Sequence, residues 1–123
     1  DPLVEIVCYC LNPNHFHLCL RQKKENGISE FMNRVSGGYA RYFNKRHKRT
    51  GALLEGRFKA KHIIDNNYLL HLSSYINLNN KVHSLDEGWD KLVRSSWNDY
   101  VSENPGISTH KIVTKQFKER GDY

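Results

Sequence analysis

The sequence predicts a single domain over residues 1–123 that combines β-strands with α-helices, and two observations lead to this expectation. The segments 3–10 and 15–20 are rich in apolar, β-branched and aromatic side chains, which is typical of strands. Residues 29–49 and 65–79 instead place apolar side chains three and four positions apart, which is typical of helices that bury one face. The chain is long enough for one hydrophobic core and too short for two.

The apolar content and the cysteine spacing limit the classes of protein to which this chain can belong. No stretch reaches the roughly 18 consecutive apolar residues of a membrane span, and no secretory leader opens the sequence. We therefore expect no membrane association and a cytoplasmic location. The three cysteines, Cys8, Cys10 and Cys19, are odd in number and lack the Cys-x-x-Cys spacing of zinc sites. We expect them to be reduced and mostly buried.

The segment 12–20 is the most informative part of the chain. If it is extended, alternation places His15 and His17 on one face, which we expect to be open to a cation. The opposite face should be buried, and it carries Phe16, Leu18 and Leu20. Turn-forming residues 12–14 come first, so this segment and residues 3–10 form either one bent strand or two strands. An alternative is that the histidines are ordinary polar residues of a half-exposed strand.

A long helix is expected from Ser29, a candidate N-cap, to the basic cluster 45–49. Its apolar stripe should pack on the core and consists of Phe31, Met32, Val35, Tyr39, Tyr42 and Phe43. Gly37 and Gly38 interrupt the stripe, and each costs about 1 kcal/mol relative to alanine inside a helix. The helix therefore either breaks there or is approached closely, and we favour the close approach of a backbone or a phosphate.

Residues 52–64 read as a second extended region, in which alternation aligns Arg57, Lys59 and Lys61 with Glu55 on one face. Residues 21–62 hold 12 of the 19 Lys and Arg and three acidic residues, an excess of +9. Residues 1–20 carry −2 and residues 63–123 carry −1. A basic block with interleaved aromatics favours a polyanion such as nucleic acid. The alternative is a basic face that is merely solvated.

A further helix over 65–79 can be capped by Asp65 or Asn66. Its core stripe consists of Leu69, Leu72 and Ile76. Tyr75 and Asn79 are one helical turn apart, so they present a hydroxyl and an amide on the same side. A tyrosine at the edge of the core, with a satisfied hydroxyl, would give the same pattern.

The pattern weakens after Asn80. We expect a short aromatic-rich helix between Trp89 and Val101, a turn at 104–106, and a last amphipathic helix capped by Ser108. The side chains of this last helix that should point inward are Ile112, Val113 and Phe117.

Four motifs then occur in one order. Residues 10–17 read Cys-Leu-Asn-Pro-Asn-His-Phe-His, 42–44 read Tyr-Phe-Asn, 51–59 read Gly-x-Leu-x-Glu-Gly-Arg-Phe-Lys, and 75–79 read Tyr-Ile-x-Leu-Asn. Together they resemble the single-tyrosine HUH transposases, named for their histidine, hydrophobic, histidine motif, and especially the repeat-associated tyrosine transposases. Asn12 stands where members of this family usually have methionine. Asn80 stands where they often have a proline after the asparagine. Residues 95–100, Ser-Ser-Trp-x-x-Tyr, are similar to the family's downstream Ser-Ser-Tyr segment.

The resemblance implies an α+β fold with a ferredoxin-like antiparallel sheet. The histidines would lie on a central strand, and the nucleophilic tyrosine on a helix that faces them. The catalytic core would span residues 1–80, followed by a C-terminal helical extension over 81–123. The family normally has a strand and a helix before the region that Leu3 opens, and we expect this sequence to lack them.

The resemblance assigns Tyr75 as the nucleophile, and His15, His17 and Asn79 as ligands of a divalent ion, Mg²⁺ or Mn²⁺. The tyrosine would form a 5′-phosphotyrosine, and this covalent link would preserve the energy of the phosphodiester bond for rejoining the strand. We expect the protein to nick and rejoin single-stranded or hairpin DNA near a prokaryotic nucleoid, as a monomer or a homodimer. Cations that would bind the DNA phosphates are Arg41, Lys45, Arg46, Lys48, Arg49, Arg57, Lys59 and Lys61. If exposed, the tyrosines at 39 and 42 could stack on a base.

Two other functions stay open at this point. The first is a nucleic-acid-binding module of the same fold that does not cut, which a divalent-dependent nicking assay would recognise. The second is a basic DNA-binding regulator in which His15 and His17 are structural. It would prefer duplex over hairpin or single-stranded DNA in a binding competition.

Overall fold

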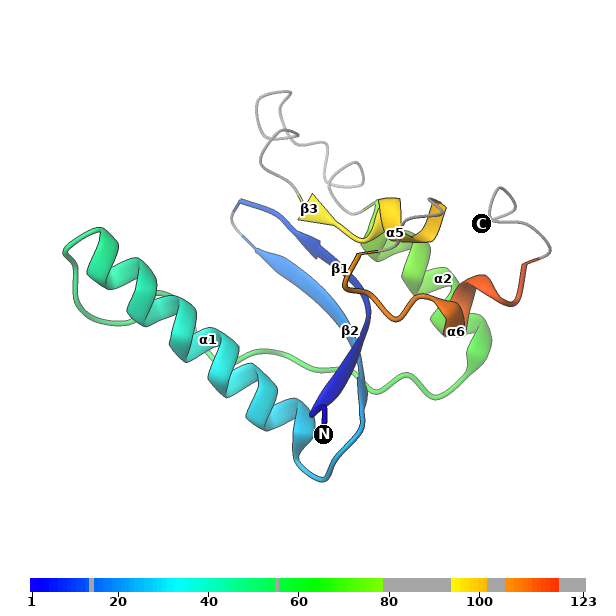
Figure 1. Ribbon diagram of the computed structural model, residues 1–123, viewed down its shortest axis with the longest axis horizontal. Helices are drawn as coiled ribbons and strands as arrows, with labels where there is room; N and C mark the ends of the chain where they lie inside the picture. The colour runs from blue at the N-terminus through cyan, green and yellow to red at the C-terminus, as the bar shows by residue number, and fades with distance from the viewer. Residues whose placement is uncertain (14, 55, 79–93, 102–105, 118–123) are drawn as a thin grey trace. The chain divides into compact units, whose positions relative to one another are not determined.

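A computed structural model describes residues 1–13, 15–54, 56–78, 94–101 and 106–117. The elements are, in chain order, β1 (Val4–Leu11), β2 (Phe16–Gln22), α1 (Gly27–Arg46), α2 (Asn66–Asn77), β3 (Arg94–Ser95), α5 (Trp97–Val101) and α6 (Lys111–Thr114) (Figure 1). The chain divides into two compact units. The helical unit comprises Asp1–Val4 and Gln22–His62, and the sheet unit comprises Glu5–Arg21 and Ile63–Tyr123.

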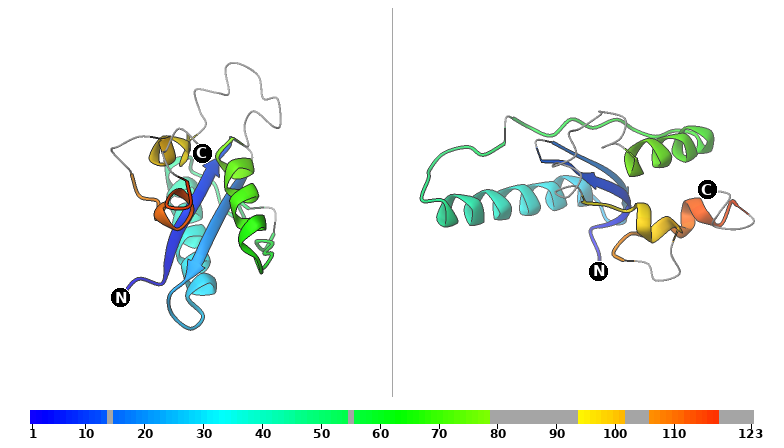
Figure 2. Two further views of the ribbon diagram at one scale, coloured as in Figure 1. Left: turned by 90° about the vertical axis from the view of Figure 1, so that its right-hand side faces the viewer. Right: turned by 90° about the horizontal axis from the view of Figure 1, so that it is seen from above.

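The sheet unit contains a three-stranded antiparallel sheet with the strand order β2-β1-β3. β1 and β2 are two separate strands that lie side by side (Figure 2). A tight turn joins them, in which the N–H of Asn12 donates to the carbonyl of His15 at 2.9 Å. β3 pairs with the end of β1, where Cys10 lies opposite Ser95. Helices accompany this sheet, so the predicted α+β class is confirmed.

A small hydrophobic core lies between the sheet, α2 and the C-terminal segment. Its buried members are Val7, Cys8, Cys10, Cys19, Ile76, Tyr100 and Val113. All three cysteines are free and buried, as predicted. The contact with Cys19, together with burial, raises the pKa of the Cys8 thiol, so this thiol stays protonated at neutral pH.

The carboxylate of Asp99 holds the segment that leads into α6. It accepts hydrogen bonds from the N–H of Gly106 at 2.8 Å and from the N–H and hydroxyl of Ser108 at 3.2 and 2.7 Å. Ser108 therefore does not cap the last helix, contrary to the prediction, because its hydroxyl is taken by this carboxylate. The helix instead begins at Lys111, after His110.

The other C-terminal predictions are confirmed in part. The aromatic-rich helix begins at Trp97, and the residues before it form β3 because their backbone pairs with β1. In α6, Val113 is buried, whereas Ile112 is 36% exposed and does not point inward; Phe117, which follows the helix, packs against the core. Residues 89–93 and 104–105 of the predicted helix and turn lie outside the described residues.

The helical unit is built around α1, which begins two residues before the predicted cap. Its N-cap is Asn26, in the left-handed conformation with φ 58°, and not Ser29. Gly27 is required next, because a Cβ there would overlap the carbonyl oxygen of Leu3. Contacts with the preceding segment thus set the start of α1, and the side chain of Asn26 makes no capping hydrogen bond.

α1 runs without a break through Gly37 and Gly38, so the alternative of a broken helix is excluded. The expected close approach of a backbone is also not found among the described residues. A Cβ at Gly37 would meet the Arg41 side chain at 3.5 Å, and one at Gly38 would meet no described atom within 4 Å.

The predicted core stripe of α1 is covered at its start and exposed farther along. Met32 is buried, whereas Val35, Tyr39 and Tyr42 are 47%, 54% and 58% exposed. The prediction that the two tyrosines belong to the core is therefore wrong. Helical spacing reveals the period of apolar side chains, but it does not reveal whether another surface covers them.

Residues 51–54 and 56–64 form neither helix nor strand, so the predicted second strand is wrong. A strand persists only where a neighbour satisfies its backbone N–H and C=O groups. The described strands pair with one another, and none pairs with this segment. Arg57, Lys59 and Lys61 are exposed, but they do not form a strand face. Within the described ranges, no helix is long and apolar enough to cross a membrane.

Candidate catalytic site

The histidine pair lies where the β1–β2 turn meets β2. His15 directly precedes the strand and His17 is its second residue, and both are half-buried. Their ring centroids are 5.3 Å apart, with the planes at 86°. Asn12, on the other side of the turn, places its amide nitrogen 3.1 Å from Nε2 of His15. The hairpin therefore holds two imidazoles and an amide together.

The burial of β2 differs from the prediction, because the face of His17 is not open and the opposite face is only partly buried. Cys19, which shares the face of His17, is 5% exposed, whereas Phe16 on the opposite face is 38% exposed. The reason is that α2 packs on the histidine face, where Ile76 joins the same core cluster as Cys19. The histidines thus lie at the edge of the core and not on an open polar face.

α2 is specified by short-range signals that the sequence displays. The carboxylate of Asp65 caps it, accepting a hydrogen bond from the N–H of Tyr68 at 2.7 Å, as predicted. The predicted apolar stripe is also confirmed, because Ile76 is buried and Leu69 and Leu72 pack against the core. The helix ends at Asn77, two residues before the predicted end.

Tyr75, in the last turn of α2, lies beside the histidine pair. Its ring centroid is 6.2 Å from that of His17, with the planes at 73°. The residue is 38% exposed, so its phenol is on the surface side of the core. Asn79, the third predicted ligand, lies outside the described residues. A single chain thus supplies a phenol and two imidazoles within one unit.

Two other tyrosines of the sheet unit have evident structural roles. Tyr100 is fully buried, and its hydroxyl donates to the carbonyl of Val7 at 2.7 Å. Burial raises the pKa of Tyr9, and the charge of Asp99 raises it further, so its phenolate is disfavoured. Tyr75 differs from both, because it combines partial exposure with a neighbouring imidazole.

The residues at this site fit a divalent ion in their donor chemistry. Imidazole nitrogens suit Mn²⁺ better than Mg²⁺, which prefers oxygen ligands. The described residues contain no cluster of three His, Cys, Asp or Glu side chains, so further ligands would be an amide, water or phosphate oxygen. Asn12 is a contact of His15 that sequence reasoning missed. The turn-forming residue types at 12–14, between two strand-like segments, are the sequence signal that could have revealed it.

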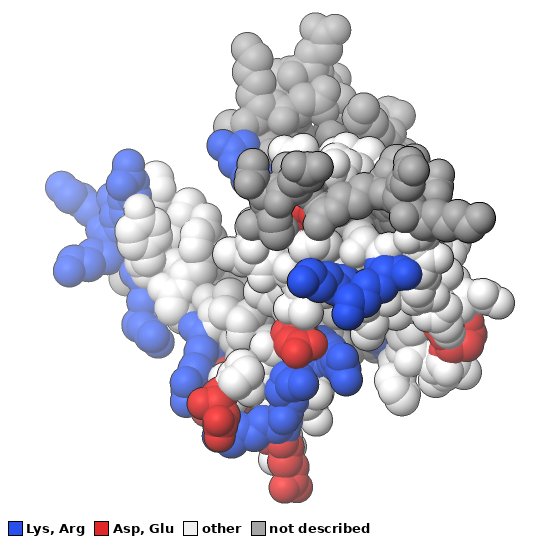
Figure 3. Space-filling view, turned by 45° about the vertical axis from the view of Figure 1, so that its right-hand side comes forward, with Lys and Arg blue, Asp and Glu red and all other residues white. Residues whose placement is uncertain are grey.

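The predicted DNA-binding cations are in the helical unit. Lys and Arg side chains gather over the C-terminal end of α1 (Figure 3). The predicted cations of the helical unit that are exposed are Arg41, Lys45, Arg46, Lys48, Arg57, Lys59 and Lys61. Arg49 differs, because it is half-buried and donates to the side chain of Asn44 at 2.7 Å and to the carbonyl of Ala52 at 3.3 Å. It therefore also shapes the turn after the helix.

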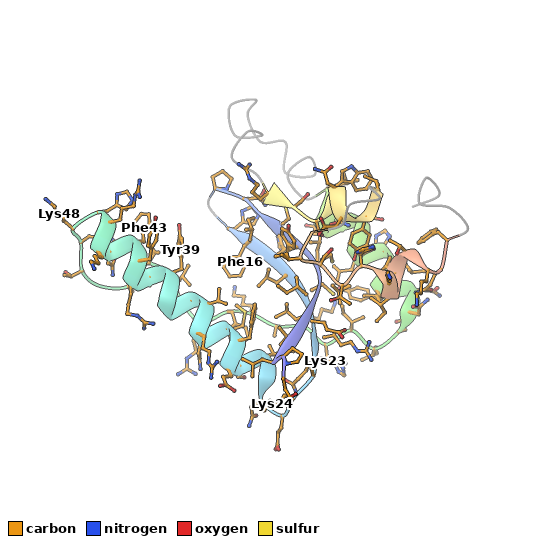
Figure 4. The ribbon with its side chains drawn as sticks, in the orientation of Figure 1. Phe16, Lys23, Lys24, Tyr39, Phe43 and Lys48 are labelled. Atoms are coloured by element: carbon orange, nitrogen blue, oxygen red, sulfur yellow. The ribbon has the colours of Figure 1, made fainter. Side chains whose placement is uncertain are left out.

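Aromatic rings accompany these cations along α1. Tyr39 and Phe43 lie on the same side of the helix, with Lys48 at its end (Figure 4). The ring centroids of Tyr39 and Tyr42 are 6.5 Å apart. Phe43 is stacked with His47 at 4.2 Å and lies under the guanidinium of Arg49 at 5.7 Å. Exposed rings next to exposed cations form a surface that suits bases and phosphates.

Comparison with known proteins identifies the family. The sequence pattern of the family described as "Transposase IS200 like" matches residues 2–79, well over half of the chain. No curated protein and no solved structure matches the chain significantly. The matched range contains the histidine pair and Tyr75, the residues that the fold brings together. The chain therefore belongs to the IS200-like transposase family.

Proposed function

We propose that this transposase nicks and rejoins single-stranded DNA through a covalent bond to Tyr75. The observation that carries the proposal is the contact between Tyr75 and His17, with the His15 ring 5.3 Å beyond it. A phenol beside two imidazoles is what metal-assisted attack on a phosphodiester requires. The family membership supports the same class of reaction.

The proposed reaction is a balanced group transfer. The Oη of Tyr75 bonds to phosphorus while the bond from phosphorus to the 3′ oxygen breaks. The tyrosine proton passes to solvent, and the departing 3′ oxygen takes up a proton. The product is a 5′-phosphotyrosine and a free 3′-hydroxyl. Attack by a 3′-hydroxyl then reverses the step and releases the tyrosine, so neither oxidant nor energy source is needed.

His15 and His17 would hold a divalent ion, Mn²⁺ or Mg²⁺, with Asn79 as a third ligand. Such an ion, when bound, supplies charge neutralisation at a non-bridging phosphate oxygen. The chain's own contribution is to hold two imidazoles at one end of the β1–β2 hairpin and to place the phenol beside them from α2. Because Asn12 contacts Nε2 of His15, it would help to orient that ring.

The substrate would be single-stranded or hairpin DNA in the cytoplasm. Exposed cations around the end of α1 would bind its phosphates, and Tyr39 and Tyr42 would stack on unpaired bases. Both tyrosines are more than half exposed, which base stacking requires. Because Tyr75 and His17 belong to one chain, each protomer would contain its own reacting groups, whether or not it forms a homodimer.

A denaturing gel tests this proposal. The protein is incubated with Mn²⁺ and a labelled single strand that carries a hairpin, and a band of covalent protein–DNA adduct is expected. Tyr75→Phe should give no adduct, while Tyr68→Phe, two turns earlier on the same helix, should give the wild-type amount. Binding without an adduct in the wild type would reject the proposal and favour a module that only binds DNA.

A further inference from the structure

Ser96, directly after β3, is hydrogen-bonded to two different elements, β1 and α2. It is fully buried. Its hydroxyl oxygen accepts a hydrogen bond from the N–H of Tyr9 at 2.9 Å, and its own N–H donates to the carbonyl of Tyr9 at 3.0 Å. The hydroxyl proton is directed to Oδ1 of Asn77 in a close contact. A single side chain thus joins β1 to the end of α2.

Asn77 is the last residue of α2 and lies two positions after Tyr75. Two residues correspond to a rotation of roughly 200° about a helix axis, so the two side chains leave α2 on nearly opposite sides. In agreement with this, Asn77 is 1% exposed while Tyr75 is 38% exposed. Fixing the amide inside the core therefore fixes the rotation of the turn that presents the phenol.

The other end of this connection leads to the histidines. Tyr9 is in β1, which is hydrogen-bonded to β2, the strand of His17. The path from Tyr75 through Asn77 and Ser96 thus leads to the sheet whose strand β2 carries His17. Apolar packing also holds α2, but apolar contacts are non-directional, whereas hydrogen bonds depend on angle and distance.

We infer that Ser96 is a positioning residue for the tyrosine nucleophile, an inference that rests on the proposed function. Ser96 lies beyond residues 2–79, the range that matches the family. A segment outside the matched range therefore completes the geometry of the site within it. Because a misplacement of about 1 Å can cost roughly 100-fold in rate, loss of this connection should slow the chemical step without weakening DNA binding.

The test compares Asn77→Ala and Ser96→Ala with Tyr100→Phe. Asn77→Ala cuts the connection to α2 but leaves Ser96 bonded to β1, where its hydroxyl is also 3.4 Å from the carbonyl of Tyr9. Tyr100→Phe is the matched control, because it removes a buried hydrogen bond between α5 and the carbonyl of Val7 in the same strand.

The readout is the single-turnover rate of adduct formation at saturating hairpin DNA and Mn²⁺, together with the Kd for that DNA. Asn77→Ala and Ser96→Ala should each lower the rate at least about tenfold with an unchanged Kd. Tyr100→Phe should keep the rate within about twofold of the wild-type rate, even if its melting temperature falls as much as those of Asn77→Ala and Ser96→Ala. The double variant should be no slower than the slower single variant, because both changes break one connection.

A second measurement does not depend on activity. In NMR spectra, the nuclear Overhauser effect between the ring protons of Tyr75 and His17 should be strong in the wild type and in Tyr100→Phe. This effect should weaken in Asn77→Ala. If Ser96→Ala does not fold, Asn77→Ala alone is sufficient for the test. An unchanged rate and an unchanged ring contact in Asn77→Ala would overturn the inference while leaving the proposed function intact. A wild type without adduct would instead reject the proposed function, and the NMR comparison would still decide the role of the connection.

Discussion

The ring of Tyr75 lies beside the ring of His17, with centroids 6.2 Å apart, although 58 positions separate the two residues in the sequence. Two local features produce this contact. A tight hairpin places His17 near the start of β2, and Asp65 caps the helix whose last turn carries Tyr75. The contact is made within one chain and within one compact unit.

This arrangement predicts that the reacting groups of one protomer work together. A mixture of His17→Ala and Tyr75→Phe proteins should form no covalent adduct, because no chain in it has both groups. The assay is a denaturing gel with labelled hairpin DNA and Mn²⁺, and wild type mixed with each variant is the control. Restored adduct in the mixture would mean that a tyrosine serves the histidines of another protomer.

Metal affinity should depend on the histidine pair. We expect His17→Ala to weaken Mn²⁺ binding at least about tenfold, since it removes an imidazole ligand. His71→Ala is the matched control, because His71 is an exposed histidine of α2 and should leave the affinity unchanged. Electron paramagnetic resonance of free Mn²⁺ measures the affinity without DNA. Equal affinities for the two variants would exclude His17 as a ligand.

DNA binding should depend on where positive charge lies and not on its total. The double variant Lys45→Ala, Lys48→Ala removes two exposed cations near the end of α1. It should weaken binding of any single strand, and the slope of log Kd against log salt should decrease by about 1.4. The control is Lys23→Ala, Lys24→Ala, with the same change in charge at the other end of α1 (Figure 4). Identical salt slopes for the two double variants would contradict a specific basic surface.

Acid should destabilise the protein in part through Asp99. Burial raises the pKa of this carboxyl group, but hydrogen bonds from Ser108 and Gly106 and the charge of His110 outweigh it, so the pKa is lowered overall. A lowered pKa stabilises the fold above the ordinary value of about 4, and this stabilisation is lost as pH falls through the folded-state pKa.

Asp99→Asn should therefore lower the free energy of unfolding by about 2 kcal/mol near neutral pH, and by progressively less below about pH 4. Urea unfolding at a series of pH values measures this difference. Asp65→Asn is the control, because asparagine caps a helix about as well as aspartate. A loss of stability that is the same at all pH values would show that the charge of Asp99 is not involved.

Features encoded by neighbouring residues could be predicted from the sequence. The cap at Asp65 and the stripe that ends at Ile76 each depend on spacing within one element, and both are observed. Such signals place the site elements, and the resemblance to the family assigns the candidate residues on them, so these residues could be named before their distance was known.

Features that depend on distant partners could not be predicted. The N-cap pattern at Ser108 predicts a helix start that the structure does not have, because the hydroxyl of Ser108 donates to Asp99, nine positions away. The connection from Asn77 to Ser96 spans 19 positions and has no periodic signature. The basic segment around Arg57 alternates like a strand, but a strand also needs a neighbour to pair with, and alternation does not supply one.

The central claim is that Tyr75 is the nucleophile, and mapping the DNA-linked residue tests it most directly. Wild-type protein is incubated with labelled hairpin DNA and Mn²⁺, denatured, and digested with protease and nuclease. Mass spectrometry then locates the tyrosine that carries the nucleotide remnant. Our account predicts a single modified peptide that contains Tyr75, with the phosphate on its Oη. A remnant on any other tyrosine, or a covalent complex that persists in Tyr75→Phe, would contradict it.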